Sequence, residues 1–593
     1  MIFVVLNGNI RDMRAICFPL DISDMIPHMR HFFRVELEDE WKLQQLSERL
    51  RRLVYGAMDY NSLIQPKRKL IYKLYMGEKW QYPKLTDLTT LDGTLTERMD
   101  LVPFMTVTAT SISEAQTNFS PHYFDSDDRQ VVDRGVRHIL LTPDEATDKD
   151  VELNRPEGRR LVKLYKSFEE AAPNYFDIFR EGERIWCERI GRSPVGKALS
   201  RTTEAANDND DNVHPWVEIT PGHAAVNAPR AIIVAMHWFQ AGGAERWALE
   251  TVKLVREAGF LPIIVTDCDG HQPWITNPVF DDALLLPMTL PLQERPGDSP
   301  LLRALFEQFN VPGILIHHCQ WMYDNLWWVK SHFPQTQVID SLHIVEYYFR
   351  GGYPKESVAH DEWIDLHHVI SPQLKHWMVD YHQIASAKVV DAPLIGLTAD
   401  AKAPKFKSRD KSKPFTVTYV GRVVRQKRPD AFILAAKAVK DAYPGEFRFI
   451  MQGSGNMDAF ADRLLKRYGL ENVVERRGMS VPVAQTYQET DALLISSVNE
   501  GITLTSIEAI SAGIPVLSAN VGSQETLIPP QGLCRRMTPQ FVRDTKSILS
   551  HIVNNEENRR KLWESELARL QKFSQMESAD AYFKKMLKEW HDQ

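Results

Sequence analysis

Two stretches of this chain alternate short apolar runs with amphipathic segments, and no other feature constrains its fold as strongly. In the first stretch, buried-strand runs at 231–235 and 261–266 flank an amphipathic helix at 245–258. In the second stretch, strand-like runs occur at 415–420, 447–452, 492–497 and 515–518, with helices between them. This alternation is typical of parallel α/β units. We therefore predict an α/β protein in which two Rossmann-like lobes face each other across a cleft.

The chain has 593 residues, which is too long for one hydrophobic core. Residues 201–229 are rich in Asn, Asp and Pro and have little to bury, so we expect a flexible linker there. Residues 398–414, rich in Lys, Ala and Ser, form a second soft boundary. These boundaries predict an accessory domain at 1–200, an N-lobe at 230–397, and a C-lobe at 415–593. The C-terminal helix is a candidate to cross back to the N-lobe.

The first 200 residues have no alternating strand and helix pattern. Residues 36–54 and 158–170 look like amphipathic helices, so we expect a mixed, helix-rich domain. This domain could bind a protein partner or a membrane surface, or it could be a second catalytic unit. Because it contains no nucleophile–base or metal-ligand spacing, we favour the interaction role.

Charge and cysteine content exclude several classes of protein. A formal net charge of -7 and a pI near 6.3 give no reason to expect a nucleic-acid partner. The five cysteines have no CxxC or Cys/His ligand spacing, as expected for reduced thiols in a cytoplasm. Because no apolar run approaches eighteen residues, we expect no membrane span. We therefore expect a cytoplasmic protein, and peripheral attachment at the inner face of the membrane stays open.

The first loop whose side chains could bind a ligand follows the predicted strand at 415–420. Gly421 allows a close turn, and Arg422 and Lys427 lie on the loop before the next helix. Ligands of open α/β sheets bind at this edge, where the carboxyl ends of the strands meet. One forked guanidinium and one ammonium suit a diphosphate. Taken alone, two solvated surface cations would be the better interpretation.

Two glycine turns follow neighbouring predicted strands. The turn Gly453-Ser454-Gly455 comes directly after the strand at 447–452, where backbone N–H groups could face an anion. The turn at Gly478 and Met479 could flank a nucleotide base. Each turn alone is a weak signal, since many strand-to-helix turns look like this.

The strongest signal is the stretch from Ser496 to Ala509. Glu500 and Gly501 lie on the loop after a strand, Thr503 is a plausible N-cap, and Glu508 lies on the helix. The amides of Gly501, Ile502 and Thr503 would then point out at the positive end of that helix. This arrangement offers backbone donors for phosphate and two carboxylates for hydroxyl groups.

These motifs, with Gly513-Ile-Pro-Val516 and Gly522-Ser-Gln-Glu525 after them, resemble glycosyltransferase family four. This family, also called glycosyl transferases group 1, contains retaining enzymes of the GT-B fold. The resemblance covers about residues 230–590. It implies that Arg422 and Lys427 hold the diphosphate, Glu508 the ribose, and Glu500 the donor sugar.

The predicted N-lobe resembles the same family at two places. Gly242 and Gly243 lie on its first strand-to-helix loop, and His343 matches the histidine close to the reacting sugar. Taken together, the expected donor-binding residues are Gly242, Gly243, Gly421, Arg422, Lys427, Gly453, Gly478, Met479, Glu500, Gly501, Ile502, Thr503 and Glu508. The expected catalytic residues are His343, Glu500, Arg422 and Lys427.

The chain departs from the family pattern twice. Gly501-Ile502-Thr503 replaces the frequent Gly-Phe-Gly, and Asp391-Ala-Pro-Leu394 replaces the usual Asn-Gly between the lobes. These departures put the substrate in question more than the fold. The histidine pairs His317-His318 and His367-His368 are interpreted as packing residues rather than metal ligands.

The resemblance implies transfer of a sugar from a nucleoside-diphosphate sugar to a hydroxyl of a glycan or lipid-linked acceptor, with retention of configuration. No metal or cofactor is expected, because the two cations and the helix N-terminus can stabilise the leaving diphosphate. The one metal-site candidate, Asp125-Ser126-Asp127, lacks a preceding strand and is interpreted as a solvated loop. By family habit the product would belong to polysaccharide or cell-envelope biosynthesis. The alternative is a catalytically silent nucleotide-sugar-binding module with the N-terminal region as an interaction domain.

Overall fold

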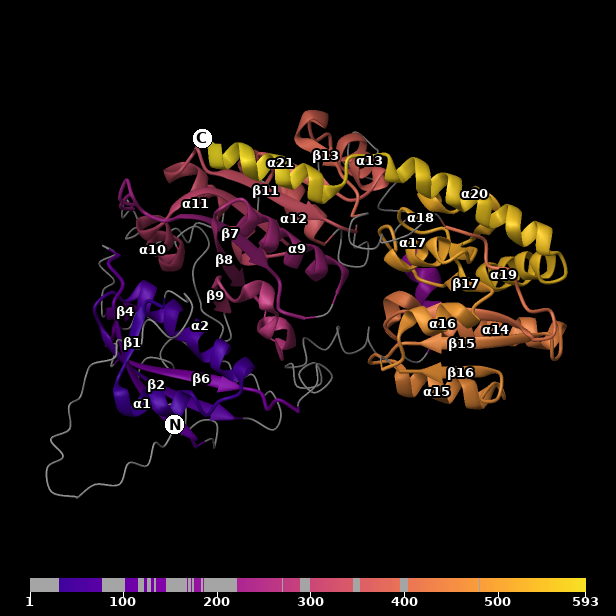
Figure 1. The fold of residues 1–593 in the computed structure, drawn as a ribbon, viewed down its shortest axis with the longest axis horizontal. Helices are drawn as coiled ribbons and strands as arrows, with labels where there is room; N and C mark the ends of the chain where they lie inside the picture. The colour runs from indigo at the N-terminus through magenta and orange to yellow at the C-terminus, as the bar shows by residue number, and fades with distance from the viewer. Residues whose placement is uncertain are drawn as a thin grey trace, which may run out of the picture.

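The computed structural model describes residues 31–76, 102–115, 122–124, 130–132, 135–145, 168, 172, 175–182, 185, 221–240, 242–268, 270–287, 299–344, 352–394, 404–478 and 480–592. Figure 1 shows two large α/β lobes and a smaller N-terminal sheet beside the first of them. Both predicted parallel α/β lobes and the mixed N-terminal region are confirmed.

The N-lobe is built on a seven-stranded sheet in the order β13-β12-β11-β10-β7-β8-β9. All of its strand pairs are parallel. The strands are β7 (Arg230–Met236), β8 (Leu261–Thr266), β9 (Leu284–Pro287), β10 (Asn310–His317), β11 (Gln337–Leu342), β12 (Leu366–Val369) and β13 (Val389–Asp391). They are almost continuously buried because helices such as α9 (Gly243–Glu257), α10 (Pro300–Gln308) and α11 (Gln320–His332) cover the sheet.

The C-lobe is built on a six-stranded parallel sheet in the order β16-β15-β14-β17-β18-β19. Its strands are β14 (Phe415–Val420), β15 (Phe447–Gln452), β16 (Val474–Arg477), β17 (Ala492–Ile495), β18 (Val516–Ala519) and β19 (Leu533–Cys534). Its helices are α14 (Pro429–Ala442), α15 (Asp458–Arg467), α16 (Val483–Glu489), α17 (Leu504–Ser511), α18 (Gln524–Leu527), α19 (Thr538–Val553) and α20 (Glu556–Ser574). The order places β14 and β17 side by side, so the loops that leave their carboxyl ends are neighbours.

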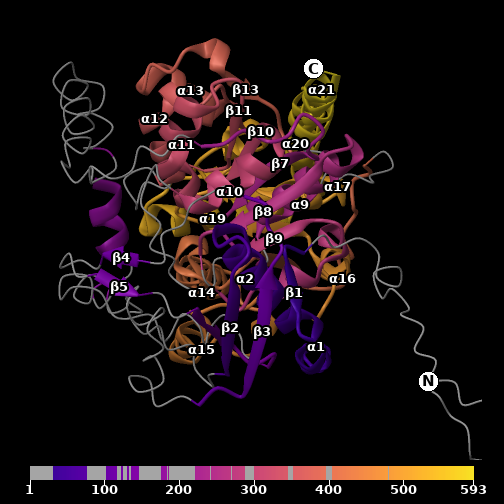
Figure 2. The same ribbon diagram turned by 90° about the vertical axis from the view of Figure 1, so that its left-hand side faces the viewer.

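The last helix, α21 (Ala579–Asp592), lies on the N-lobe although it follows the C-lobe in the chain (Figures 1 and 2). Arg230 donates to the carbonyl oxygens of Trp590 and His591, each at 2.6 Å. The Trp590 ring packs against Gly313, where a side chain would collide with it. The two lobes are therefore connected twice, once through residues 391–415 and once through this helix.

The N-terminal sheet has the order β1-β3-β2-β6, with two antiparallel pairs and one parallel pair. Its strands are β1 (Phe33–Val35), β2 (Lys69–Met76), β3 (Met105–Ser111) and β6 (Val136–Leu141), and β4 (His122–Phe124) pairs with β5 (Gln130–Val132). The single helix predicted at 36–54 is wrong. The structure has α1 (Leu37–Leu43) and α2 (Glu48–Ile64), because the side chain of Ser47 caps a new helix by accepting from the amide of Leu50 at 3.3 Å.

Helix α2 joins the N-terminal sheet to the N-lobe, as Figure 2 shows. Leu50, Leu53 and Met58 belong to one buried cluster with Ile232 and Val234 of β7. Arg49 donates to the carbonyl oxygen of His271 at 2.6 Å, which adds a buried polar link. The helix expected at 158–170 lies outside the described residues, except for Phe168.

The two predicted boundaries contain ordered residues. The linker predicted at 201–229 is described from residue 221, where the amide of Gly222 donates to Glu307 of α10 at 3.1 Å. At the second boundary, the Lys407 amide donates to Gly513 at 3.0 Å and its ammonium to Thr490 at 2.5 Å. Within the described residues, no helix is both long and apolar enough to cross a membrane.

Candidate functional site

The predicted donor loops lie where the parallel order of the C-lobe places them. The loop after β14 carries Arg422 and Lys427, and the loop after β17 carries Glu500 and Gly501. Hydrogen bonds tie the two loops together. The backbone amide of Val498 donates to the carbonyl oxygen of Gln426 at 2.9 Å, and the side-chain amide of Gln426 donates to the carbonyl oxygen of Asn499 at 3.1 Å. The structure therefore turns residues that are distant in sequence into one platform.

Lys427 and Glu500 form an ion pair at the centre of this platform. Glu500 is buried, and its carboxylate also accepts a hydrogen bond from Ser497 at 2.5 Å. Arg422 differs from Lys427, because its side chain is exposed and has no ion pair within the described residues. Without a ligand, the site thus holds one paired cation and one solvated cation.

The start of α17 supplies unpaired backbone donors beside Glu500. Within the described part of the chain, the N–H groups of Gly501, Ile502 and Thr503 have no protein acceptor. Thr503 is the N-cap residue of α17, but its hydroxyl makes no capping bond and lies 2.5 Å from the hydroxyl of Ser506. The positive end of α17 is therefore left open to an anion.

Sequence reasoning assigned an anion-facing role to the Gly453 turn as well, and two amides of this turn already have protein acceptors. The amide of Gly453 donates to Arg477 at 2.9 Å, and the amide of Gly455 donates to the Asp458 carboxylate at 3.0 Å. Gly453 has a φ of 135°, and a side chain there would collide with the carbonyl oxygen of Gly421. This turn therefore packs against the Arg422 loop, and its contact with an anion stays a prediction.

Two residues that hold the Glu500 loop were given no role from the sequence. Gly522 has a φ of 53°, and a side chain at this position would overlap the carbonyl oxygen of Glu500. Gln524 donates to the carbonyl oxygen of Gly501 at 3.2 Å and to the Thr503 hydroxyl at 3.3 Å. The signal that could have found them is the motif Gly522-Ser-Gln-Glu525, which the resemblance contained without a function.

His343 lies where the two lobes meet. Gly501 of the C-lobe packs so closely on the carbonyl oxygen of His343 that no side chain would fit there. The imidazole is buried, and its Nε2 has no hydrogen-bond partner among the described residues. Burial, helped by His318 and His317, lowers the pKa of His343 well below its usual range. His343 therefore favours the neutral imidazole and has one buried polar atom without a partner among the described residues.

Within the described part of the chain, the other predicted donor residues make no hydrogen bond or ion pair with the Lys427–Glu500 pair. Glu508 on α17 accepts a hydrogen bond from the Tyr487 hydroxyl at 3.3 Å, and Ile502 is half-buried. Gly478 follows β16 at the carboxyl edge of the same sheet, while Met479 lies outside the described residues. These positions agree with the expected edge of the sheet and leave the contact with a base untested.

Gly242 and Gly243 lie at the start of α9 in the N-lobe. A side chain at Gly242 would collide with the carboxylate of Glu245, which accepts from the Trp238 indole at 2.9 Å. Within the described residues, no hydrogen bond or ion pair joins these glycines to Arg422, Lys427 or Glu500. A role for Gly242 and Gly243 in donor binding therefore stays a prediction.

The histidine pair His367-His368, on β12, has ordinary structural partners. His367 lies 3.0 Å from Asp340 and 2.9 Å from Asp361. Burial alone would lower the pKa of His367, but the two carboxylates outweigh burial and raise it to about 9. His368 is hydrogen-bonded to Ser341 and to the carbonyl oxygen of Ala392, each at 2.8 Å.

One described group has the composition of a metal site. His237, Asp267 and Cys268 place their ligand atoms within 4.8 Å of one another at the carboxyl ends of β7 and β8. His237 Nδ1 is already 2.9 Å from the Tyr353 hydroxyl, and Asp267 accepts from the Trp321 amide at 3.1 Å. His237 Nδ1 and one Asp267 oxygen thus already have protein partners, while the buried Oδ1 of Asp267 has no hydrogen-bond partner among the described residues. The predicted acidic loop at 125–127 lies outside the described residues.

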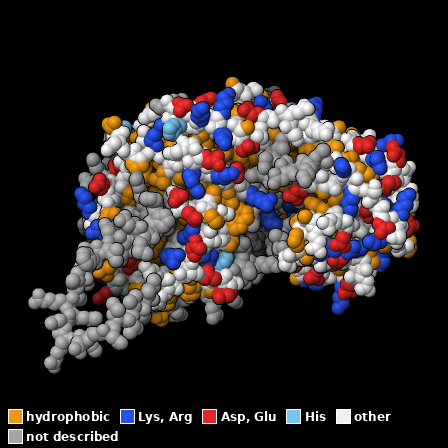
Figure 3. Space-filling model, viewed as in Figure 1, with side chains coloured by type: hydrophobic (Ala, Val, Ile, Leu, Met, Phe, Trp, Pro, Cys, Tyr) orange, Lys and Arg blue, Asp and Glu red, His pale blue; other side chains and the backbone are white. Residues whose placement is uncertain are grey.

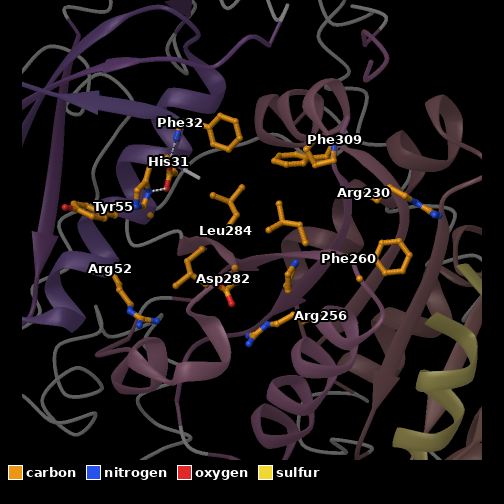
Figure 4. Close-up of a pocket in the computed structure, with 18 residues that line it drawn as sticks. His31, Phe32, Arg52, Tyr55, Arg230, Arg256, Phe260, Asp282, Leu284 and Phe309 are labelled. Atoms are coloured by element: carbon orange, nitrogen blue, oxygen red, sulfur yellow. Dashed lines mark hydrogen bonds and ion pairs between the residues drawn. The ribbon is translucent and has the colours of Figure 1, made fainter. Parts of the chain in front are cut away.

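A cavity of about 580 Å³ lies between α2 and the amino-terminal ends of the N-lobe strands. Figure 4 shows Phe32 and Tyr55 on the N-terminal side and Phe260 and Phe309 on the N-lobe side. Its cations already have partners, since Arg52 donates to Ile275 at 3.1 Å and pairs with Asp281 at 2.6 Å. Because this cavity lies at the amino ends of the strands, we assign the functional site to the platform at the carboxyl ends.

Two parallel α/β lobes that meet at a charged platform make this a two-lobed α/β protein. Residues 400–564 match the family described as glycosyl transferases group 1. This match falls within the region in which the sequence resembles the same family.

Two curated relatives match parts of the chain. The UDP-N-acetylglucosamine–peptide N-acetylglucosaminyltransferase GtfA subunit of Streptococcus pneumoniae is 28% identical over 109 residues, which are 18% of this chain and 21% of that protein. D-inositol 3-phosphate glycosyltransferase of Paenarthrobacter aurescens is 27% identical over 152 residues, 24% of this chain and 37% of that protein. The matched segments thus span well under half of either relative.

Among solved structures, Anabaena HepE in complex with UDP and glucose has a TM-score of 0.47 at 15% identity, covering 61% of this chain and 98% of that chain. The pneumococcal O-GlcNAc transferase GtfA in complex with UDP and GlcNAc has a TM-score of 0.44 at 13% identity, covering 61% and 99%.

Proposed function

We propose that the chain is a retaining glycosyltransferase that moves a sugar from a nucleoside-diphosphate sugar to a hydroxyl acceptor. The observation that carries the proposal is the platform at the C-lobe strand ends. There the Lys427–Glu500 pair lies beside the three open amides of Gly501, Ile502 and Thr503. A diphosphate needs cations and N–H donors together, and a sugar needs a carboxylate that accepts from its hydroxyl groups.

Diphosphate binding would change the partners of Lys427. In the free protein its ammonium is paired with Glu500, and a bound diphosphate would compete for that ammonium with a larger charge. Glu500 would then be free to accept hydrogen bonds from the donor sugar, while Ser497 still holds its carboxylate. The exposed Arg422 would close on the phosphates from solvent, and Glu508 would take the ribose.

The leaving diphosphate gathers negative charge as the glycosidic bond breaks. Arg422, Lys427 and the start of α17 would stabilise this charge through fixed donors, without a resident metal ion. The acceptor would approach from the N-lobe beside the neutral His343, whose Nε2 can hydrogen-bond a sugar hydroxyl. We assign deprotonation of the acceptor to the leaving phosphate.

For the pathway, we propose a glycan or lipid-linked acceptor of polysaccharide or cell-envelope biosynthesis, with the enzyme in the cytoplasm or at the inner face of the membrane. The named functions of the two relatives, transfer to a peptide and to an inositol phosphate, set the first acceptors to test.

The test is release of nucleoside diphosphate from UDP-N-acetylglucosamine, UDP-glucose, UDP-galactose and GDP-mannose, with and without glycoside, peptide and inositol phosphate acceptors. We expect wild type to turn over at least one donor, and Glu500→Ala to lose roughly 10- to 100-fold in kcat/KM, as for a lost hydrogen bond to a charged group. Glu564→Ala, an exposed glutamate on α20, is the matched control and should equal wild type.

Three results would count against the proposal or its site. Unchanged turnover in Glu500→Ala would remove Glu500 from the site. Donor binding without turnover on any acceptor would favour the silent binding module. No binding of any nucleoside diphosphate would overturn the proposed function.

A further inference from the structure

A short helical segment that precedes the linker lies on the C-lobe. Residues 175–182 are helical, and Figure 1 shows this violet segment among the orange elements of the C-lobe. The N-terminal sheet, by contrast, packs on the N-lobe through α2. The region before the linker therefore contacts both lobes rather than forming one separate accessory unit.

The segment contacts the donor loop itself. The Asp177 carboxylate forms an ion pair with Arg425 and lies 3.9 Å from the guanidinium of Arg428. The hydroxyl of Thr538, at the start of α19, is 3.5 Å from the same carboxylate. Glu181, one helical turn later, is 4.0 Å from Arg536. All of these partners belong to the C-lobe.

Charge balance explains why Asp177 matters. The side chains of Arg428 and Asp430 are 1% exposed, that of Asp177 is 7% exposed and that of Arg425 is 16% exposed. Of this cluster, the C-lobe supplies two cations and one anion, and Arg425 is already 2.9 Å from Asp430. Asp177 supplies the second anion. A buried cation without its counter-charge is strongly unfavourable, so the loop depends on this external carboxylate.

The dependence runs in both directions. Burial raises the pKa of Asp177, while Arg425 and Arg428 oppose that rise. The two guanidinium groups therefore favour the charged form of the carboxylate against its burial. Removing either side of the cluster leaves the other with an unbalanced buried charge.

The two arginines bracket the diphosphate-binding lysine. Arg425, Gln426 and Lys427 form one short 3-10 turn, and Arg428 follows in a left-handed conformation with a φ of 45°. Arg428 also donates to the carbonyl oxygen of Arg536 at 2.6 Å and to that of Ser496. Lys427 thus lies between two residues whose orientation depends on Asp177.

We propose that Asp177 is a positioning residue for the donor site: its carboxylate completes the buried Arg425–Arg428–Asp430 cluster and so holds Lys427 where the diphosphate binds. This inference rests on the proposed function, because it assumes that Lys427 meets a diphosphate. The proposal gives the region before the linker a defined role. One part of this region packs on the N-lobe, and another part orders the donor loop of the C-lobe.

The test uses the full chain with Asp177→Asn, which removes the charge and keeps the size. We expect the Kd of the nucleoside diphosphate and the donor KM to rise roughly tenfold, the scale at which residues outside a site modulate it. Turnover at saturating donor should change less. The matched control is Asp544→Asn, which breaks the surface pair with Arg535 on the same lobe and should bind like wild type.

A second variant separates positioning from general loss of structure. Asp177→Asn combined with Arg425→Gln removes one cation with the anion and restores the balance of the cluster. Its Kd should return toward that of wild type, which a merely structural defect would not predict. If Asp177→Asn folds poorly, Asp177→Glu keeps the charge, shifts it by one methylene and should raise Kd in the same direction by less.

Each outcome decides a different claim. If folded Asp177→Asn binds the nucleoside diphosphate with the wild-type Kd, this inference is wrong and the proposed function stands. If the double variant is no better than the single one, Asp177 acts through packing and not through charge, which also overturns the inference. If wild type binds no nucleoside diphosphate at all, the proposed function fails and the inference fails with it.

Discussion

Replacing Lys427 with Ala is expected to lower the kcat of nucleoside-diphosphate release by about 100- to 1,000-fold, as when a fixed donor to developing negative charge is removed. The ammonium is held between the two donor loops by Glu500, and its loop is fixed by hydrogen bonds from Ser496 to the carbonyl oxygens of Lys427 and Arg428 at 2.8 and 2.9 Å. Among the described residues, Lys427 is the one cation that pairs with Glu500, so we expect no neighbouring cation to take its place. Steady-state kinetics on the donor that wild type uses would measure the loss.

Two controls separate chemistry from folding in that experiment. Lys437→Ala removes an exposed lysine of α14 that pairs with Asp441 and should leave kcat unchanged. Thermal unfolding should show that Lys427→Ala still folds, although buried Glu500 then keeps only its Ser497 partner. A folded Lys427→Ala with wild-type kcat would show that the diphosphate binds elsewhere.

Replacing Gly522 with Ala is expected to reduce kcat/KM by about 100-fold, the loss that follows a displacement of roughly 1 Å at a catalytic group. The new methyl group would overlap the carbonyl oxygen of Glu500, so the Glu500 loop has to move. A left-handed φ of 53° adds a penalty of about 1–2 kcal/mol for a residue with a side chain. The same kinetic assay and a melting curve would measure both effects.

The chain offers a matched control for the backbone penalty. Gly469 has a φ of 60°, and a side chain there would meet nothing within 4 Å. Gly469→Ala should therefore lower the melting temperature through the backbone penalty alone and leave kcat/KM intact. Equal activity of the two variants would mean that the position of the Glu500 loop does not matter for turnover.

The sequence predicted both lobes well because their strands are buried on both faces and therefore appear as unbroken apolar runs. The strands at 415–420 and 447–452 were predicted to the residue, while the predicted strand at 492–497 ends earlier, at Ile495. Ser496 and Ser497 instead leave the ladder so that their hydroxyls can bond the donor loops. Burial pattern shows where a strand lies but not where the backbone leaves it.

The helix boundary near Ser47 was predicted wrongly for a different reason. Amphipathic periodicity continues across 44–47, and only the capping bond of Ser47 shows the break. A glycine turn after a strand predicts a close approach, but the sequence does not say which group comes close. At Gly453 the neighbour is the carbonyl oxygen of Gly421.

Long-range partners were beyond any local pattern. Asp177 and Arg425 are separated by 248 positions, and neither residue lies in a motif that points to the other. The same holds for Gly501 and His343, which lie in different lobes and were assigned to opposite sides of the cleft. Sequence reasoning could place each group at a strand end, and only the packing of the lobes brings them together.

The central claim is that a nucleoside diphosphate binds the platform formed by Lys427, Glu500 and the start of α17. Figure 3 shows Lys and Arg side chains gathered in the hollow between the two lobes. Amide hydrogen exchange, with and without the nucleoside diphosphate of the preferred donor, tests it most directly. We predict slower exchange in peptides that cover 498–505 and 421–428, because the open amides of Gly501, Ile502 and Thr503 would gain an acceptor. Saturating ligand that leaves both peptides unchanged and protects another region, such as the cavity beside α2, would contradict the account.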